Sequence, residues 1–392
     1  MLHLGQSLDD GVGLAPMEGV SDFPMRLWMS VTSQPLFQVT PFLRVTHTYP
    51  KHLPINWAPE IFMDGLSDCL SYSLVPQLMC PQPEPFVEVA RKILQHSPFV
   101  ELNCGCPAPM VVGKGAGSGL LREPAEFHKF IKYCSNELGK GKLAIKIRTG
   151  FESSARYTEL IDGLRGLSLK RLTIHGRTRA QKYQGYADWE QILLAAMELN
   201  YPVHGSGDIV DDSCLRKKLG KQHPIKGAIV GRGALRNPWI FKELRTSART
   251  QIEGKTLLTA IESYALILEV FSSKPESLYS ICLDGTFKQC IDNDYEAWKN
   301  LSSKLKAVLP SSQEPMISKK SLGKVKMLWN YLRSSLPPSL FNPKLLRCSK
   351  FEEFLGAISE QLSAATQERR FLELKWQKEY DWIYAGEKKP VI

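Results

Sequence analysis

The chain has 392 residues, of which 43% are hydrophobic and 23% charged, and its pI is about 9.0. This composition is ordinary for a folded protein and excludes bulk disorder and collagen-like structure. The length fits one large α/β barrel with an appendage, or two to three smaller domains. Lys and Arg exceed Asp and Glu by 50 to 40, which gives a formal net charge of +10.

Short apolar segments, many of them β-branched, recur from the N-terminus at intervals that fit a strand, a helix and two loops. Continuous apolar runs of this kind are typical of parallel strands that are covered on both faces. Eight such units over about 235 residues match the size of a TIM barrel, and a doubly wound sheet is the alternative. The predicted strands lie in 11–17, 35–45, 71–79, 99–105, 142–150, 171–178, 201–209 and 227–235.

Helical patterns lie between these strands and replace them after about residue 250. The predicted helices are 84–96, 123–138 and 188–199, followed by 257–271, 323–333 and 352–384. Prolines indicate loops or an insertion in 272–295 and 308–318. We therefore predict an α/β chain with a TIM (β/α)8 barrel domain at 1–245 and a C-terminal helical bundle domain at 246–392, with an insertion near 272–318.

All of the excess positive charge lies in the predicted bundle. Residues 299–350 hold eleven Lys and Arg and one acidic residue, Glu314, so the rest of the chain has no net charge. Clustered cations favour a polyanionic partner, because binding to phosphates releases counterions. A solvated helical face is the alternative, and a charge run taken alone favours it.

The cysteines and the N-terminus indicate the cellular compartment. Nine cysteines without a C-x-x-C pair are typical of a reducing environment. The N-terminus has no basic region followed by an apolar stretch, and no apolar run approaches the ~18 residues that span a membrane. We expect a cytoplasmic monomer without a membrane partner.

Polar residues and glycines end seven of the eight predicted strands, at the face where barrel enzymes carry their active sites. The glycines after the last two strands favour a phosphate site, to which Arg232 adds charge, and tight turns without a ligand are the alternative. Lys146 is expected to meet an anion or an electron-rich ring, because a buried unpaired lysine is costly; Schiff-base chemistry is the competing role. His175 is placed to hydrogen-bond the same ligand.

Two cysteines follow the fourth strand with different prospects. Cys106 lies between Gly105 and Pro107, where an exposed thiol acts as a nucleophile or a proton donor, whereas Cys104 is expected to pack. No further Cys/His pair has ligand spacing, so we predict no metal site. The stretch GKGAGSG at 113–119 lacks the Ser or Thr of a P-loop, and we interpret it as a flexible loop over the barrel mouth.

Taken together, these segments resemble the dihydrouridine synthase family of tRNA-modifying flavoenzymes. The matching blocks are LAPMEGVSDFPMRL (14–27), VPQL (75–78), VELNCGCP (100–107), KIRTGF (146–151), HGRT (175–178), GSGDI (205–209), GRGAL (231–235) and LGKVKMLWNYLR (322–333). The spelling APMEGV and the stretch around Arg44 favour the bacterial subgroup that modifies uridine 16 in the D-loop.

The resemblance implies FMN as cofactor and NADPH as electron donor. Hydride would pass from the reduced flavin to uridine C6, and Cys106 would protonate C5. The implied FMN-binding residues are Pro16, Met17, Glu18, Gln77, Lys146, His175, Ser206, Gly207, Asp208, Gly231 and Arg232. Those implied to bind the uridine or the tRNA are Asn103, Arg148, Arg44, Arg177, Lys324, Lys326, Arg333 and Arg347.

Departures from the family pattern leave alternatives open. Ser206 stands where family members commonly have Asn, and Ala108-Pro109-Met110 replaces a stretch that commonly holds a basic residue. One alternative is an FMN barrel oxidoreductase of a small molecule, of the dihydroorotate dehydrogenase kind, against which the basic bundle and Cys106 argue. The other is a tRNA-binding protein that has lost catalysis, against which Cys106, Lys146 and His175 argue.

Overall fold

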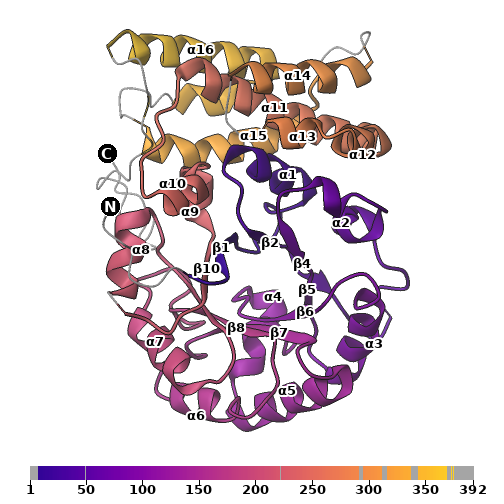
Figure 1. The fold of residues 1–392 in the computed structure, drawn as a ribbon, viewed down its shortest axis with the longest axis vertical. Helices are drawn as coiled ribbons and strands as arrows, with labels where there is room; N and C mark the ends of the chain where they lie inside the picture. The colour runs from indigo at the N-terminus through magenta and orange to yellow at the C-terminus, as the bar shows by residue number, and fades with distance from the viewer. Residues whose placement is uncertain are drawn as a thin grey trace.

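A single sheet of parallel strands forms the centre of the larger part of the molecule (Figure 1). The computed structural model describes residues 8–48, 50–220, 222–290, 295–310, 316–336, 343–368, 372 and 374. The strands are β1 (Gly11–Leu14), β2 (Phe37–Val39), β3 (Leu43–Arg44), β4 (Ser73–Val75), β5 (Gln77–Met79), β6 (Val100–Cys104), β7 (Leu143–Arg148), β8 (Arg171–His175), β9 (Val203–Ser206) and β10 (Gly227–Val230). They are almost continuously apolar because helices cover the outer face of the sheet.

The ten strands form eight continuous runs, because prolines interrupt two of the predicted strands. The order in the sheet is β3-β5-β6-β7-β8-β9-β10-β1-β2-β4, and β2 pairs with β4 as β3 pairs with β5. Pro41 separates β2 from β3 and Pro76 separates β4 from β5, since proline has no N–H for the ladder. Thr40 bridges the gap by donating its N–H to the Val75 carbonyl oxygen at 3.0 Å and accepting the Gln77 N–H at 2.9 Å. The two ends of the order are thus joined within single runs, which closes the barrel and confirms the TIM-barrel prediction.

Helices surround the barrel (Figure 1), and three of them occupy the predicted ranges 84–96, 123–138 and 188–199. Pro83 and Pro124 occupy the first turns of α3 and α5, where a missing N–H costs no helical hydrogen bond. Asp22 caps α1 by accepting the Met25 N–H. The barrel helices are α1 (Phe23–Thr32), α2 (Pro59–Phe62), α3 (Pro83–Ile93), α4 (Pro109–Val112), α5 (Pro124–Leu138), α6 (Tyr157–Asp162), α7 (Trp189–Glu198), α8 (Asp212–Leu219), α9 (Arg232–Arg236) and α10 (Ile240–Thr246).

The remaining helices gather on one side of the barrel (Figure 1). They are α11 (Gly254–Ser273), α12 (Pro275–Leu283), α13 (Thr286–Gln289), α14 (Tyr295–Val308), α15 (Lys319–Leu332) and α16 (Phe351–Glu368). The helix α11 packs against α14, α15 and α16, and also against α1 of the barrel. Across that last contact, Trp28 donates its indole N–H to the Ala260 carbonyl oxygen at 2.8 Å. The expected domain boundary at residues 245–246 falls at the end of α10.

The prediction of loops in 272–295 was wrong. Pro275 lies in the first turn of α12, where proline is tolerated, and a second short helix, α13, follows it. Residues 311–315 of the second predicted segment, and the last part of the predicted helix 352–384, lie outside the described residues.

The helix α11 is, within the described residues, the one segment long and apolar enough to cross a membrane. In this fold, 61% of its most apolar window is buried inside the protein, as in the core helix of a bundle. The nine cysteines are all free thiols.

Candidate active site

A cavity of about 430 Å³ opens at the carboxyl ends of the barrel strands. This volume is in the range of cofactor and small-molecule sites. Every residue that the sequence assigned to FMN lines it except Gln77, and so do Asn103, Cys106 and Arg148. The predicted residues in its wall are Pro16, Met17, Glu18, Asn103, Cys106, Lys146, Arg148, His175, Ser206, Gly207, Asp208, Gly231 and Arg232.

Strand register brings the polar groups of neighbouring strands to matching heights. Asn103 in β6 is paired with Lys146 in β7. One step further along the barrel axis, Arg148 is paired with His175, and His175 with Ser206. Paired residues on adjacent parallel strands lie about 5 Å apart, so the side chains form two adjoining polar layers.

Lys146 and His175 bring nitrogen atoms without protein partners in the described ranges to the cavity, and of the two only Lys146 carries a positive charge at pH 7. The Lys146 ammonium has no hydrogen bond or ion pair within the part of the chain that the structure describes. Burial, together with nearby Arg148, lowers the pKa of Lys146 to about 8. Burial, followed by Arg148 and Lys146, also holds the pKa of His175 well below its usual range, so its ring is neutral at pH 7. The His175 Nδ1 is buried and has no partner among the described residues.

The turns after β9 and β10 approach each other closely. Asp208 has a left-handed backbone with φ of 52°, and its Oδ2 accepts from Arg177 at 2.8 Å and from the Ala187 N–H at 2.7 Å. A Cβ on Gly233 would lie 2.2 Å from the Ile209 carbonyl oxygen, so only glycine fits there. The other carboxylate oxygen of Asp208 is buried and unpartnered within the described residues.

The loop that carries Cys106 is held from both sides. The Asn103 Oδ1 accepts the Gly105 N–H at 3.0 Å and the Cys106 N–H at 2.9 Å. The carbonyl oxygen of Cys106 accepts the Ser118 N–H at 3.1 Å and the Ser118 hydroxyl at 2.8 Å. The Cys106 side chain remains half-buried at the cavity wall. Cys104 is fully buried, as expected, and burial holds the pKa of its thiol well above the usual range.

The prediction of a flexible loop at 113–119 was wrong for its second half. Residues Gly117–Leu121 form a short 3-10 helix, in which Gly117 and Ser118 are buried. A Cβ on Gly117, where φ is +57°, would lie 2.9 Å from the Cys106 carbonyl oxygen. This close packing explains the glycines, and it makes Ser118 a support for the cysteine loop that sequence reasoning missed.

Three predicted contact residues are placed differently from expectation. Gln77 is fully buried and does not line the cavity; it bonds to Glu101 and Asn103 at 2.7 Å each. Arg177 is fully buried against Asp208 and has no surface for RNA. Arg148 lines the cavity, but it donates to backbone carbonyls, including that of Gly105 at 2.7 Å.

The residues of the bundle that were predicted to contact RNA also differ in their exposure to solvent. Lys324 forms an ion pair with Asp22 of the barrel, and Lys326 donates to the carbonyl oxygens of Leu346 and Cys348. These two lysines therefore have structural partners in the protein. Arg333 is partly exposed. Exposed cations are Arg347 and Arg44 from the prediction, together with Lys319, Lys320 and Lys350 from the same basic segment.

Two tyrosines line the cavity without a sequence signal. Tyr331 comes from α15, so the helical region contributes to the wall. Tyr183 follows β8, and its ring lies 4.2 Å from the Arg232 guanidinium and 5.8 Å from that of Arg148. Both give the mouth an aromatic surface of the kind on which bases stack.

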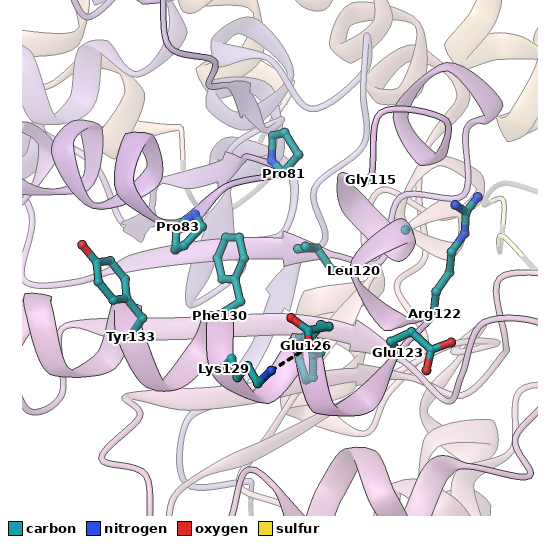
Figure 2. Close-up of a pocket in the computed structure, with 12 residues that line it drawn as sticks. Pro81, Pro83, Gly115, Leu120, Arg122, Glu123, Glu126, Lys129, Phe130 and Tyr133 are labelled. Atoms are coloured by element: carbon teal, nitrogen blue, oxygen red, sulfur yellow. Dashed lines mark hydrogen bonds and ion pairs between the residues drawn. The ribbon is translucent and has the colours of Figure 1, made fainter.

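A second cavity, of about 530 Å³, lies on the outer side of the barrel beside α5 (Figure 2). Figure 2 shows Phe130 at its centre, between Pro83 and the ion pair of Lys129 with Glu126, whose atoms are 2.8 Å apart. Among the described residues, none that lines this cavity has a buried polar side-chain atom without a partner, in contrast to the first cavity. No cluster of three His, Cys, Asp or Glu able to hold a metal occurs in the described ranges.

A closed (β/α)8 barrel with polar side chains converging on a cavity at the carboxyl ends of its strands has the architecture of a TIM-barrel enzyme. The chain belongs to the dihydrouridine synthase (Dus) family, whose model matches residues 13–293. The resemblance seen in the sequence is thereby confirmed.

Several similar proteins carry related names. The chain is 32% identical over 216 residues to a tRNA-dihydrouridine(47) synthase of Malassezia globosa, covering 48% of this chain and 27% of that protein. It is 29% identical over 236 residues to the tRNA-dihydrouridine(16) synthase of Haemophilus ducreyi, covering 59% and 72%. It is 30% identical over 272 residues to a probable tRNA-dihydrouridine synthase of Helicobacter pylori, covering 67% and 76%. The chain thus spans about a quarter of the first of these relatives and about three quarters of the other two. A structure of morphinone reductase in complex with tetrahydroNAD aligns with a TM-score of 0.40 at 11% identity, covering 60% of this chain and 86% of that one.

Proposed function

We propose that this protein is an FMN-dependent, NADPH-driven tRNA-dihydrouridine synthase that reduces uridine 16 of the D-loop to 5,6-dihydrouridine. The observation that carries the proposal is the convergence of Cys106, Lys146 and His175 on one cavity in a Dus-family barrel. The proposal needs neither a metal nor a membrane, and it takes the enzyme to act as a cytoplasmic monomer.

The cavity fits FMN by the chemistry of its unsatisfied groups. The unpaired Lys146 ammonium and the neutral His175 suit the carbonyl edge of a flavin ring. Arg232, beside the turns at Gly207 and Gly231, suits the phosphate. The free oxygen of Asp208 is an acceptor suited to a ribityl hydroxyl. Pro16, Met17 and Glu18 would form the wall against the ring.

When bound, reduced FMN supplies the hydride that goes to uridine C6. Cys106 supplies the proton: its S–H bond breaks as a C–H bond forms at C5, and the thiolate then takes a proton from solvent. Asn103 and Ser118 hold the backbone on either side of Cys106, which fixes the thiol relative to the cavity. This arrangement limits the motion of the acid during transfer.

The uridine has to leave the tRNA stack to reach this cavity, at a cost of a few kcal/mol. Phosphate contacts offset such a cost, and the exposed Arg44, Arg347, Lys319 and Lys320 are available for them. Tyr183 and Tyr331 at the mouth offer stacking surfaces for the displaced base.

We choose position 16 over position 47 because the chain spans a larger share of the relative that is named for position 16. The relative named for position 16 is spanned over 72% of its length, whereas the first relative named for position 47 is spanned over 27%. The APMEGV spelling of 15–20 favours the same choice.

Two measurements test the proposal. The purified protein should bind FMN and form dihydrouridine in unmodified tRNA when NADPH is supplied, and sequencing should place the product at position 16. Cys106→Ala should abolish product while FMN stays bound, whereas Cys104→Ala, a fully buried control, should keep turnover. Dihydrouridine at position 47 would instead correct the proposed position of the modified uridine in the tRNA. Reduction of a small molecule without any activity on tRNA would overturn the proposal in favour of an FMN barrel oxidoreductase that acts on small molecules.

A further inference from the structure

A continuous chain of hydrogen bonds runs beneath the cavity to the cysteine loop. The Glu101 Oε1 accepts from the Gln77 Nε2 at 2.7 Å, and the Gln77 Oε1 accepts from the Asn103 Nδ2 at 2.7 Å. The Asn103 Oδ1 then accepts the N–H groups of Gly105 and Cys106. The three side chains are 0%, 0% and 5% exposed, so water does not compete for these bonds.

The direction of every amide in this chain is fixed from both ends. Backbone N–H groups only donate, so the Asn103 atom that faces Cys106 has to be oxygen. The Asn103 nitrogen therefore faces Gln77, and the Gln77 nitrogen faces the next group along. That group is the carboxylate of Glu101, which accepts. The orientation of both amides is thus required by the donors and the acceptor at the two ends of the chain.

Glu101 accepts hydrogen bonds from two residues of β8, one of which lies at the end of that strand away from the cavity. Its Oε2 accepts from the Arg171 guanidinium at 3.1 Å, at the first residue of β8, and Thr173 donates at 3.5 Å. Arg171 is 5% exposed and lies 4.7 Å from the ring of Phe37 and 5.5 Å from that of Phe99. Packed in this way, it has little freedom to turn away from Glu101.

We propose that Glu101 is a positioning residue, whose carboxylate sets the direction of the Gln77 and Asn103 amides and thereby holds the Cys106 loop in the arrangement that proton transfer requires. The catalytic part of this inference rests on the proposed function of Cys106. The positional part depends only on the bonds between the four residues. It gives Gln77 a role as the link between Glu101 and Asn103.

Exchange of Glu101 for glutamine makes a specific conflict. If the new amide turns its oxygen to Gln77, its nitrogen faces Arg171, and two donors meet. If it turns its oxygen to Arg171, Gln77 and Asn103 both have to reverse, and the Asn103 nitrogen then faces the Cys106 N–H. In the first case the bond from Arg171 that anchors the end of the chain is lost, and in the second case the bond to the Cys106 N–H is lost. Adding Gln77→Glu removes the conflict, because Glu at 77 accepts from both of its neighbours.

The test compares E101Q, the double variant E101Q/Q77E and the matched control Glu60→Gln. Glu60 is also a buried glutamate, 2% exposed and paired with an arginine, Arg26, at 2.7 Å, but it has no bond to the chain. The first readout is the rate at which iodoacetamide alkylates Cys106 in the flavin-free protein, followed by peptide mass spectrometry. The second is the single-turnover rate of dihydrouridine formation.

E101Q should speed the alkylation of Cys106 and slow single turnover roughly tenfold to a hundredfold, as expected for a misplaced catalytic group. E101Q/Q77E should recover most of both rates, and E60Q should change neither. Unchanged rates in E101Q, or a folded double variant without recovery, would overturn the proposal. If E101Q does not fold, Asn103→Ala breaks the last link, and wild-type alkylation in that variant overturns the proposal as well. A wild-type protein inactive on tRNA would overturn the proposed function, while the alkylation arm would still decide on the positioning.

Discussion

Lys324 of α15 forms an ion pair with Asp22, the residue that caps α1 of the barrel. One carboxylate oxygen of Asp22 accepts the Met25 N–H, and the other binds the lysine. Their side chains are only 29% and 28% exposed, and the residues are 302 positions apart in sequence. The pair joins the helical region to the barrel on the same helix that places Tyr331 in the cavity wall.

We expect Lys324→Glu to destabilise the protein by about 1–2 kcal/mol, because it places two partly buried carboxylates together at a helix cap. The control is Lys320→Glu on the same helix, where the lysine is exposed. Lys320→Glu should leave the free energy of unfolding unchanged, and it should weaken tRNA binding and reduce its salt dependence. Denaturant unfolding and filter binding at several salt concentrations measure the two effects. A Lys324→Glu protein of normal stability would show that the ion pair does not hold the two parts together.

A second prediction concerns the glycines of the turn after β10. Gly233→Ala should destabilise the protein by about 1–3 kcal/mol, since its Cβ would meet the Ile209 carbonyl oxygen at 2.2 Å and force the two turns apart. Gly231→Ala is the control, because its Cβ would meet nothing closer than 3.7 Å. Thermal unfolding of both variants without flavin should separate them. Equal melting temperatures would show that the backbone around Gly233 yields easily.

Much of the fold was predictable because its signals are local. The eight apolar runs and the helices between them predicted the barrel, whose closure then follows from parallel pairing of neighbouring runs. The breaks at Pro41 and Pro76 divide strands without changing their order. The error at Pro275 arose because proline both ends helices and begins them, and only the following pattern distinguishes the two.

The sequence predicted which residues line the site better than it predicted which partners their side chains bind. Strand ends placed Lys146 and His175 at the cavity because every strand of a parallel barrel ends at the same face. Arg177 and Lys324 were assigned to RNA on the family resemblance, and the sequence does not show which acidic residues they meet. Their partners, Asp208 and Asp22, are brought to them only by the tertiary fold.

A third prediction concerns Ser118, which sequence reasoning missed. Ser118→Ala removes the hydroxyl that bonds the Cys106 carbonyl oxygen and keeps the Ser118 N–H bond, so we expect a loss of about 1 kcal/mol in stability. Turnover should fall severalfold, because the loop gains freedom. Ser30→Ala, which removes a buried hydroxyl bonded to the Leu27 carbonyl oxygen in α1, should cost similar stability and leave turnover unchanged. Equal turnover in the two variants would contradict a role for Ser118 in holding the cysteine.

The final prediction follows from the pKa of Lys146, which is lowered from 10.5 to about 8 without flavin. Between these two values the unfolded chain keeps the proton and the folded protein loses it. Stability therefore rises with pH across this window, since the unfolded state binds more protons. Compared with Lys146→Met, which has no charge to bury, the flavin-free wild type should gain about 2–3 kcal/mol from pH 8 to pH 10.5.

Flavin binding should show the opposite trend in the same window. If the Lys146 ammonium holds the flavin edge, binding above pH 8 requires uptake of a proton, and FMN affinity should fall by up to tenfold per pH unit. Lys146→Met should bind FMN more weakly at pH 7 and lose this pH dependence. Fluorescence titration with FMN from pH 7 to pH 10 measures both effects. An affinity that is flat with pH in the wild type would mean that another group holds the polar edge of the flavin.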